Sequence, residues 1–157
     1  MEEIKLVRHA PGAPGLRFLG LGPGYRPMRG IYKLQSLLDH HSFWANGRSI
    51  KNLKILLCKS SAIVTLWRGQ RLIGFGRGTS DGIYRAVLWD VVVAEDVQGK
   101  GLGREVVQAL LNFKCIKNVE RIYLMTTEGS DFYKQLGFKV VEEQKLMILN
   151  IRNTTKS

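Results

Sequence analysis

This sequence has few of the residues that cross-link a chain or bind metals. It contains only two cysteines and three histidines among 157 residues. Cys58 and Cys115 do not form a C-x-x-C pair, and the histidines at positions 9, 40 and 41 do not have the spacing of a metal-binding motif. We therefore expect reduced thiols, no disulfide framework and no metal site.

Long apolar runs are missing as well. No stretch approaches the roughly 18 apolar residues that a membrane-spanning helix needs. The chain starts with Met-Glu-Glu-Ile, which lacks the basic and apolar regions of a signal peptide and the Arg- and Ser-rich composition of a transit peptide. We therefore expect a cytoplasmic protein, or one made inside an organelle, with no membrane span.

Acidic residues are scarce relative to basic ones. The chain has 13 Asp and Glu against 24 Lys and Arg, a formal charge of +11, and such a field attracts polyanions. It has no run of five or six like charges and no aromatic-glycine element of the RNA-recognition type. Nucleic acid is therefore not expected as the main partner, although an inactive module that binds nucleic acid or protein stays open as an alternative.

The length allows one domain, 1–157, in which residues 1–30 are partly irregular and 151–157 form a flexible tail. Apolar periodicity and turn residues place the elements within it. Helices are predicted at 31–40, 50–59, 101–114 and 131–136. Strands are predicted at 3–8, 62–67, 71–77, 83–94, 121–125, 138–141 and 145–150.

The most informative stretch begins in the strand at 83–94, where Val91, Val92 and Val93 are typical of a strand buried on both faces. Glycines follow at positions 99, 101 and 103, and they let successive N–H groups point at one acceptor. The next helix would direct its positive dipole end to the same point, where Lys100 and Arg104 add full charges. This pattern predicts a pyrophosphate-binding loop.

Two common phosphate motifs do not fit this loop. The third glycine of a G-x-G-x-x-G dinucleotide motif would fall at Arg104, and no G-x-x-x-x-G-K-[ST] string occurs in the chain. Gln98-Gly-Lys-Gly-Leu-Gly103 instead resembles Q/R-x-x-G-x-G/A, the acetyl-CoA pyrophosphate loop of the GCN5-related N-acetyltransferases (GNAT family). Asp131-Phe-Tyr-Lys-Gln-Leu-Gly-Phe138 resembles the family's later F-Y-x-x-x-G-F element.

Within this family, the strings at 75–81 and 89–93 are most similar to a plastid and cyanobacterial branch. That branch contains the plant-type serotonin N-acetyltransferases and plastid protein-lysine acetyltransferases. The resemblance implies an α/β (α+β) GNAT fold. Its central sheet is mixed and mostly antiparallel, with a V-shaped splay between two parallel strands and helices on both faces.

The resemblance also implies a binding site for acetyl-CoA. The backbone of Val91, Val92 and Val93 would bind pantetheine and offer one N–H to the thioester oxygen. The remaining cosubstrate-binding residues would be Gln98, Gly99, Lys100, Gly101, Leu102, Gly103, Arg104, Thr126 and Tyr133.

For catalysis, the resemblance implies that Tyr133 returns a proton to the leaving thiolate. Asp90 is the candidate base, acting directly or through water, with Asp81, Glu95, Asp96 and Glu128 as other candidates. Thr126 can bind CoA but cannot act as a base. Cys115 has no recognisable His partner nearby in the sequence, so we expect direct transfer in a ternary complex rather than a covalent intermediate.

The predicted acceptor is a primary amine, an arylalkylamine such as serotonin or tryptamine, with protein lysine as the alternative. The family often forms dimers through its closing strands, so a homodimer is one candidate assembly, and the oligomeric state stays open. If the gene is organellar, the expected location is the plastid stroma.

Overall fold

The computed structural model describes residues 2–152. The chain divides into two compact units, one ending at Met125 and the other beginning at Thr126, and each is described by itself. The prediction of one domain over 1–157 stays a prediction. The main elements of the first unit are β1 (Ile4–His9), α1 (Gly30–His41), α2 (Ile50–Cys58), β2 (Ala62–Arg68), β3 (Arg71–Ser80), β4 (Arg85–Val93), α3 (Leu102–Leu111), α4 (Lys114–Lys117) and β5 (Arg121–Leu124).

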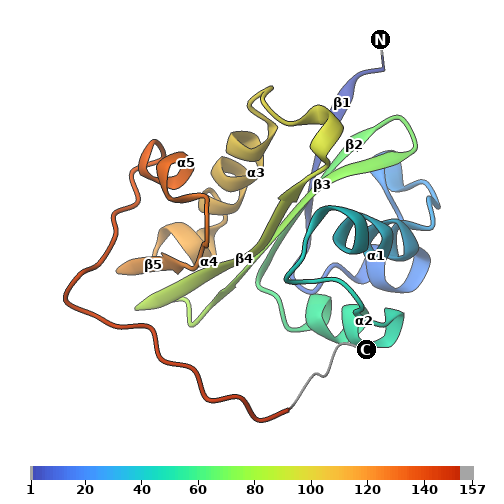
Figure 1. The fold of residues 1–157 in the computed structure, drawn as a ribbon. Helices are drawn as coiled ribbons and strands as arrows, with labels where there is room; N and C mark the ends of the chain where they lie inside the picture. Colours follow the sequence, from blue (N-terminus) through green and yellow to red (C-terminus); the bar gives the residue numbers. More distant parts are fainter. Residues whose placement is uncertain (1, 153–157) are drawn as a thin grey trace. The chain divides into compact units, whose positions relative to one another are not determined.

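The five strands form one sheet in the order β1-β2-β3-β4-β5. Neighbours from β1 to β4 are antiparallel, whereas β4 and β5 are parallel. Helices α1 and α2 lie against one face of the sheet, and α3 and α4 lie against the other (Figure 1). The predicted mixed sheet with helices on both faces is therefore confirmed.

Two glycines of β3 let the helices on one face pack directly on the strand backbone. A Cβ added at Gly76 would lie 2.7 Å from Cγ1 of Val106 in α3. A Cβ at Gly78 would lie 2.9 Å from Cδ1 of Ile116 in α4. Since real side chains do not tolerate such contacts, α3 and α4 depend on these bare positions for their close packing.

Two elements differ from the predicted pattern. The helix predicted at 101–114 ends at Leu111, and a separate α4 begins at Lys114, so Cys115 lies in the second of two short helices. The segment predicted to be irregular before residue 30 contains a π-helical turn at Gly15–Leu19. The apolar spacing of 102–113 is continuous and does not show where one helix stops.

The second unit contains α5 (Ser130–Lys134), where a short helix was predicted. Gly137 follows with φ +94°, a conformation suited to ending the helix. The predicted strands at 138–141 and 145–150 are wrong, because residues 138–152 form no strand. Their composition favours extended backbone, but a strand also needs a hydrogen-bonded neighbour, which composition cannot supply. Of the predicted tail 151–157, residues 153–157 lie outside the described chain.

Candidate functional site

The parallel strands β4 and β5 pair over only part of the length of β4, because β5 is shorter and ends at Leu124. The register of β4 and β5 begins at Arg85 with Arg121 and ends at Leu88 with Leu124. Beyond Leu88, residues 89–93 of β4 pair only with β3 among the residues that the structure describes. This is the predicted splay, and it leaves one edge of β4 open to an extended ligand, which could bind as an added strand does.

A β-bulge interrupts β4 at the start of this open edge. Trp89 pairs with Arg77 and Val92 with Phe75, so Asp90 and the residue after it stand opposite a single residue of β3. Asp90 has φ +52°, a conformation that costs most L-residues about 1–2 kcal/mol and that aspartate adopts more readily than most. A bulge redirects the side chains around it, and it often lies next to a functional site.

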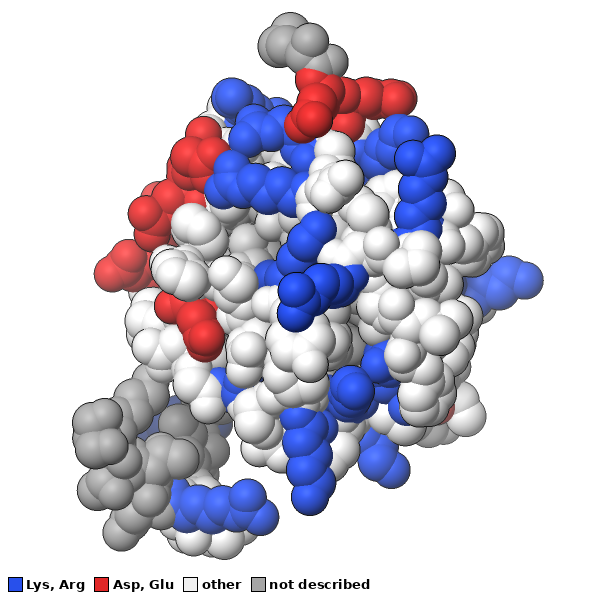
Figure 2. All heavy atoms as spheres, turned by 90° about the vertical axis from the view of Figure 1, so that its right-hand side faces the viewer, with Lys and Arg blue, Asp and Glu red and all other residues white. Residues whose placement is uncertain are grey.

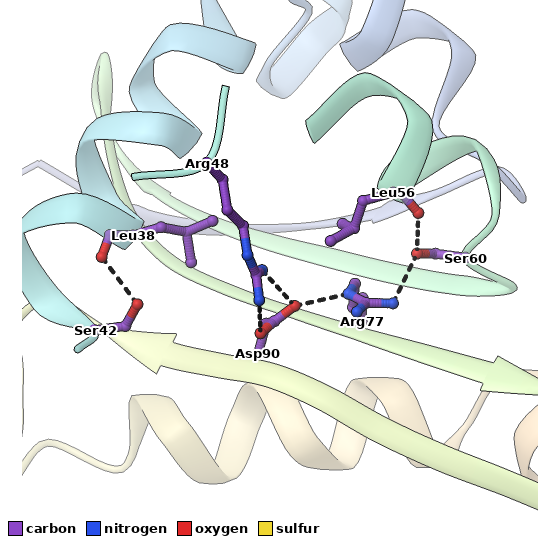
Figure 3. Close-up of polar contacts among 7 residues, drawn as sticks. All are labelled: Leu38, Ser42, Arg48, Leu56, Ser60, Arg77 and Asp90. Carbon is purple, nitrogen blue, oxygen red and sulfur yellow. Dashed lines mark hydrogen bonds and ion pairs between the residues drawn. The ribbon is translucent and has the colours of Figure 1, made fainter. Parts of the chain in front are cut away.

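The carboxylate of Asp90 is bound by two guanidinium groups (Figure 3). Nη1 and Nη2 of Arg48 donate to Oδ2 and Oδ1 at 2.9 and 3.3 Å, and Nε of Arg77 donates to Oδ2 at 2.8 Å. The Asp90 side chain is 5% exposed. Burial alone would raise the pKa of Asp90, but the hydrogen bonds and charges of Arg48 and Arg77 outweigh burial and lower it.

This geometry bears on the base predicted at Asp90. A general base needs a free lone pair and a pKa near the working pH. Both carboxylate oxygens of Asp90 already accept hydrogen bonds from arginines, and its pKa is lowered. The base role stays a prediction, and these contacts favour a structural role. Arg48 and Arg77 lie 42 and 13 residues away from Asp90 in the sequence, and no sequence motif marks either of them as its partner.

The glycine-rich loop after β4 has the backbone that the sequence predicts. Gly99 and Gly101 have φ +78° and +79°, and a Cβ added at either would meet no atom within 4 Å. Nε2 of Gln98 donates to the carbonyl of Val93 at 2.9 Å. Gln98 therefore ties the loop to the end of β4 and fixes where its backbone lies.

Helix α3 starts directly from this loop. Gly101 is its N-cap residue and makes no side-chain cap, so the N–H groups of the first turn are available to a ligand. Lys100 and Arg104 are exposed beside them. A loop in left-handed conformation, an uncapped helix start and two cations fit the pyrophosphate of acetyl-CoA.

Thr126 and Tyr133 lie in the second unit. The Thr126 hydroxyl accepts a hydrogen bond from the N–H of Gly129 at 2.9 Å. The ring of Tyr133 packs edge-to-face between Phe132 and Phe138, with centroids 4.9 and 5.8 Å away. Burial raises the pKa of the Tyr133 phenol, which keeps the proton that a general acid must donate. The binding and acid roles of both residues stay predictions.

The thiol of Cys115 is not an activated nucleophile. Burial raises the pKa of Cys115, which disfavours the thiolate form. Its Sγ lies 3.7 Å from the carbonyl of Ser61, a contact that a neutral thiol makes. These contacts support transfer without a covalent intermediate on this cysteine.

A family model for the acetyltransferase (GNAT) domain matches residues 59–140. The chain belongs to the GNAT acetyltransferase family.

Three relatives are similar over part of the chain. An uncharacterized N-acetyltransferase, ycf52, of Pyropia yezoensis is 37% identical over 113 residues, covering 69% of this chain and 64% of that protein. Histone acetyltransferase TAP1 of Glycine max is 30% identical, with coverages of 72% and 53%. GCN5-related N-acetyltransferase 2, chloroplastic, of Arabidopsis thaliana is 37% identical, with coverages of 47% and 29%. The chain thus spans less than two thirds of the length of each.

A solved structure supports the family at the level of fold. A probable acetyltransferase from meticillin-resistant Staphylococcus aureus superposes with a TM-score of 0.71 at 20% identity, covering 94% of this chain and 99% of that one. The GNAT fold predicted from the sequence is thereby confirmed. Between residues 2 and 152, no helix has the length and apolar character needed to cross a membrane.

Proposed function

We propose that this protein is an N-acetyltransferase that moves the acetyl group of acetyl-CoA to a primary amine. One observation carries the proposal: β4 loses its partner strand after Leu88, and the same strand leads into a left-handed glycine loop at the start of α3. The open edge suits an extended pantetheine chain, and the loop suits the pyrophosphate to which that chain is attached.

Main-chain groups would make most of the contacts with acetyl-CoA. Val91, Val92 and Val93 would offer main-chain groups along the open edge, and the loop 98–104 would hold the phosphates. The two valine side chains that follow the bulge residues, Val92 and Val93, are buried and only need to pack. When bound, acetyl-CoA supplies the acetyl group as an activated thioester.

The chemistry we propose is direct transfer. The amine nitrogen forms a bond to the acetyl carbon, an N–H of β4 stabilises the negative charge on the acetyl oxygen, and the carbon–sulfur bond then breaks. Tyr133 donates its phenolic proton to the sulfur. Asp90 is bound by two arginines and its pKa is lowered, so we propose that water carries away the proton of the amine.

For the acceptor we propose an arylalkylamine such as serotonin or tryptamine. Trp89 lies at the open edge, where its Nε1 donates to Oγ1 of Thr79 at 2.8 Å and Arg77 lies 5.7 Å from its ring. In the connection between α1 and α2, Phe43 and Trp44 form an edge-to-face pair with centroids 5.2 Å apart, and they are 63% and 47% exposed. Aromatic rings whose orientation is fixed by such contacts can stack on the ring of an indole ligand.

A protein lysine is the second candidate within the same chemistry. It is favoured by the relative from Glycine max, whose name states histone acetyltransferase activity. The chloroplastic relative from Arabidopsis supports a plastid stroma location as a further proposal. A homodimer also remains our proposal for the assembly.

A binding module without turnover is the alternative from another class. On the face shown in Figure 2, Lys and Arg side chains are spread over much of the surface, and Asp and Glu lie mainly toward its top and left side. A dispersed positive charge of this kind favours general attraction of anions over one nucleic-acid groove. The positive charge is then an aid to binding a phosphorylated cosubstrate.

The first experiment is calorimetric titration of acetyl-CoA into the purified protein. Micromolar affinity, about −8 kcal/mol, is the expected result, followed by release of CoA thiol when tryptamine or a lysine peptide is added. The aromatic proposal expects Trp44→Ala to lower kcat/KM for tryptamine more than for the lysine peptide. Tight, salt-dependent binding of duplex DNA without affinity for acetyl-CoA would overturn the enzyme proposal in favour of the binding module.

A further inference from the structure

The cluster of Asp90, Arg48 and Arg77 lies directly beneath the open edge of β4. Arg77 contacts both Trp89 and Asp90, which shows that these two side chains lie on the same face of the sheet. The bulge is what brings them to one face. Strand alternation without the bulge would instead turn Asp90 toward the face of Leu88, which α3 and α4 cover. The position of this carboxylate and the path of the open edge therefore depend on the same local distortion.

The other face of the bulge is packed tightly. A Cβ added at Gly76, the residue opposite the bulge, would lie 2.9 Å from Cδ1 of Leu110 and 3.5 Å from Cγ2 of Val91. Helix α3 thus presses on the bulge from one side, and the charged cluster binds it from the other. A bulge held on both faces has little freedom to move.

Arg48 is itself anchored between two helices. Its carbonyl accepts a hydrogen bond from Nε2 of Gln35 in α1 at 3.0 Å, and Ser49 caps α2 through the N–H of Asn52 at 3.1 Å. Its guanidinium extends from this connection to Asp90 on β4 (Figure 3). Arg77 approaches from β3, and its Nη1 also lies 3.5 Å from the hydroxyl of Ser60. Three separate elements of the first unit therefore meet at one carboxylate.

From these contacts we infer that Arg48 and Arg77 are positioning residues, which clamp Asp90 and thereby fix the β4 backbone that binds the thioester. The inference rests on the proposed function for the ligand, although the clamp itself is a property of the protein alone. It gives Asp90 a role in which it touches neither the amine nor the acetyl group. Asp90 has a left-handed backbone conformation, which is unfavourable by itself. The hydrogen bonds from the two arginines stabilise this conformation, since they would be lost if the bulge straightened.

The direct test measures amide hydrogen exchange by NMR without ligand. Arg48→Gln and Asp90→Asn each break the clamp, and asparagine keeps the size and left-handed tolerance of the aspartate. We expect exchange of those amides at 91–93 that bond to β3 to become roughly tenfold faster, with Thr65 in β2 unchanged. Arg71→Gln is the matched control, since it removes the same charge from the exposed pair with Asp96 and should leave 91–93 unchanged.

The second test separates a clamp from a catalytic base. If the clamp acts as a unit, Arg48→Gln and Asp90→Asn each weaken acetyl-CoA binding about tenfold, and the double variant is no weaker than either single one. If Asp90 is the base, Asp90→Asn lowers kcat with binding retained, and Arg48→Gln shifts the acid limb of the pH profile. The clamp would be overturned by any of three results. These are the base-like behaviour just described, a double variant whose loss of affinity is the product of the two single losses, and unchanged amide exchange at 91–93. If the wild type binds no acetyl-CoA, the proposed function fails while the exchange experiment still decides the clamp.

Discussion

Two regions of the same sheet face keep their buried polar groups in different ways. At β1 and β2, Trp67 donates to Oγ1 of Thr65 at 2.8 Å, and Nε2 of His9 lies 2.8 Å from the same oxygen. Thr65 and Trp67 are fully buried, and burial lowers the pKa of His9 to about 4, so this network is neutral at pH 7. At β3 and β4 the polar group is instead the charged Asp90.

One network is neutral and the other is charged because the backbone around them differs. The first lies where β2 has a paired strand on both sides, despite one register shift between Leu66 and Trp67, so neutral hydrogen bonds are sufficient to satisfy its polar atoms. The second lies at a strained bulge beside an unpaired edge, where charged hydrogen bonds provide a stronger restraint. The comparison suggests that ionic contacts occur where the backbone itself must be held for binding.

The largest expected effect comes from breaking the open edge. Val93→Pro should remove a backbone donor and place a ring beside the ligand, a loss on the order of 3 kcal/mol or about 100-fold in acetyl-CoA affinity. Val93→Ile keeps the backbone and the β-branched shape and should bind within about twofold. Calorimetry measures both affinities, and circular dichroism checks that the variants are folded. A folded proline variant with normal affinity would show that this edge does not bind the ligand.

Much of this arrangement could be predicted from the sequence, because it depends on local signals. The hairpin of β2 and β3 follows from two apolar runs around the turn at Gly69, and the loop of Gly99 and Gly101 follows from glycine spacing. The splay came from the family resemblance. The hairpin and the loop are each encoded within one short stretch of chain, unlike the splay between β4 and β5.

The clamp and the chain end could not be predicted in this way. Arg48 meets Asp90 only after the helices pack, and a bulge at Asp90 has no glycine to mark it. The strands predicted at 138–150 had suitable residues, yet Leu146 and Met147 are 69% and 89% exposed there. Both cases depend on partners distant in the sequence, which periodicity does not report.

The next largest effect is on the pH dependence of stability. His9 has a pKa of about 4 in the folded protein against about 6.5 when unfolded, so the unfolded chain binds more protons between these values. Stability should therefore fall as the pH is lowered from about 6.5 to 4, by no more than roughly 3 kcal/mol. His9→Gln should remove this slope, measured by urea unfolding at several pH values. An unchanged slope would mean that the pKa of His9 is the same in the folded and the unfolded protein.

A smaller effect is expected at the loop that follows the open edge. Gly101→Val must adopt a left-handed backbone, which costs an L-residue about 1–2 kcal/mol and should weaken acetyl-CoA binding about tenfold. Gly101→Asn tolerates that conformation, and no neighbour lies within 4 Å of the new Cβ, so it should lose less affinity. Calorimetry of the two variants compares them directly. Equal losses would mean that the side chain, rather than backbone strain, disturbs the phosphates.

The smallest effect is expected at the exposed counterpart of the clamp. Nη1 of Arg71 lies 2.7 Å from Oδ2 of Asp96, a separation like those around Asp90, but Asp96 is 52% exposed. Hydrogen bonding from Arg71 lowers the pKa of Asp96 to about 2, so its contribution is present above pH 4 and lost as the pH falls toward 2. Salt screens such a pair, so Asp96→Asn should change the melting temperature only slightly and not at all in 1 M NaCl. Asp90→Asn should lower it at both salt concentrations, because burial protects that pair from screening. If the two variants respond alike to salt, the contrast between a surface pair and a buried clamp is wrong.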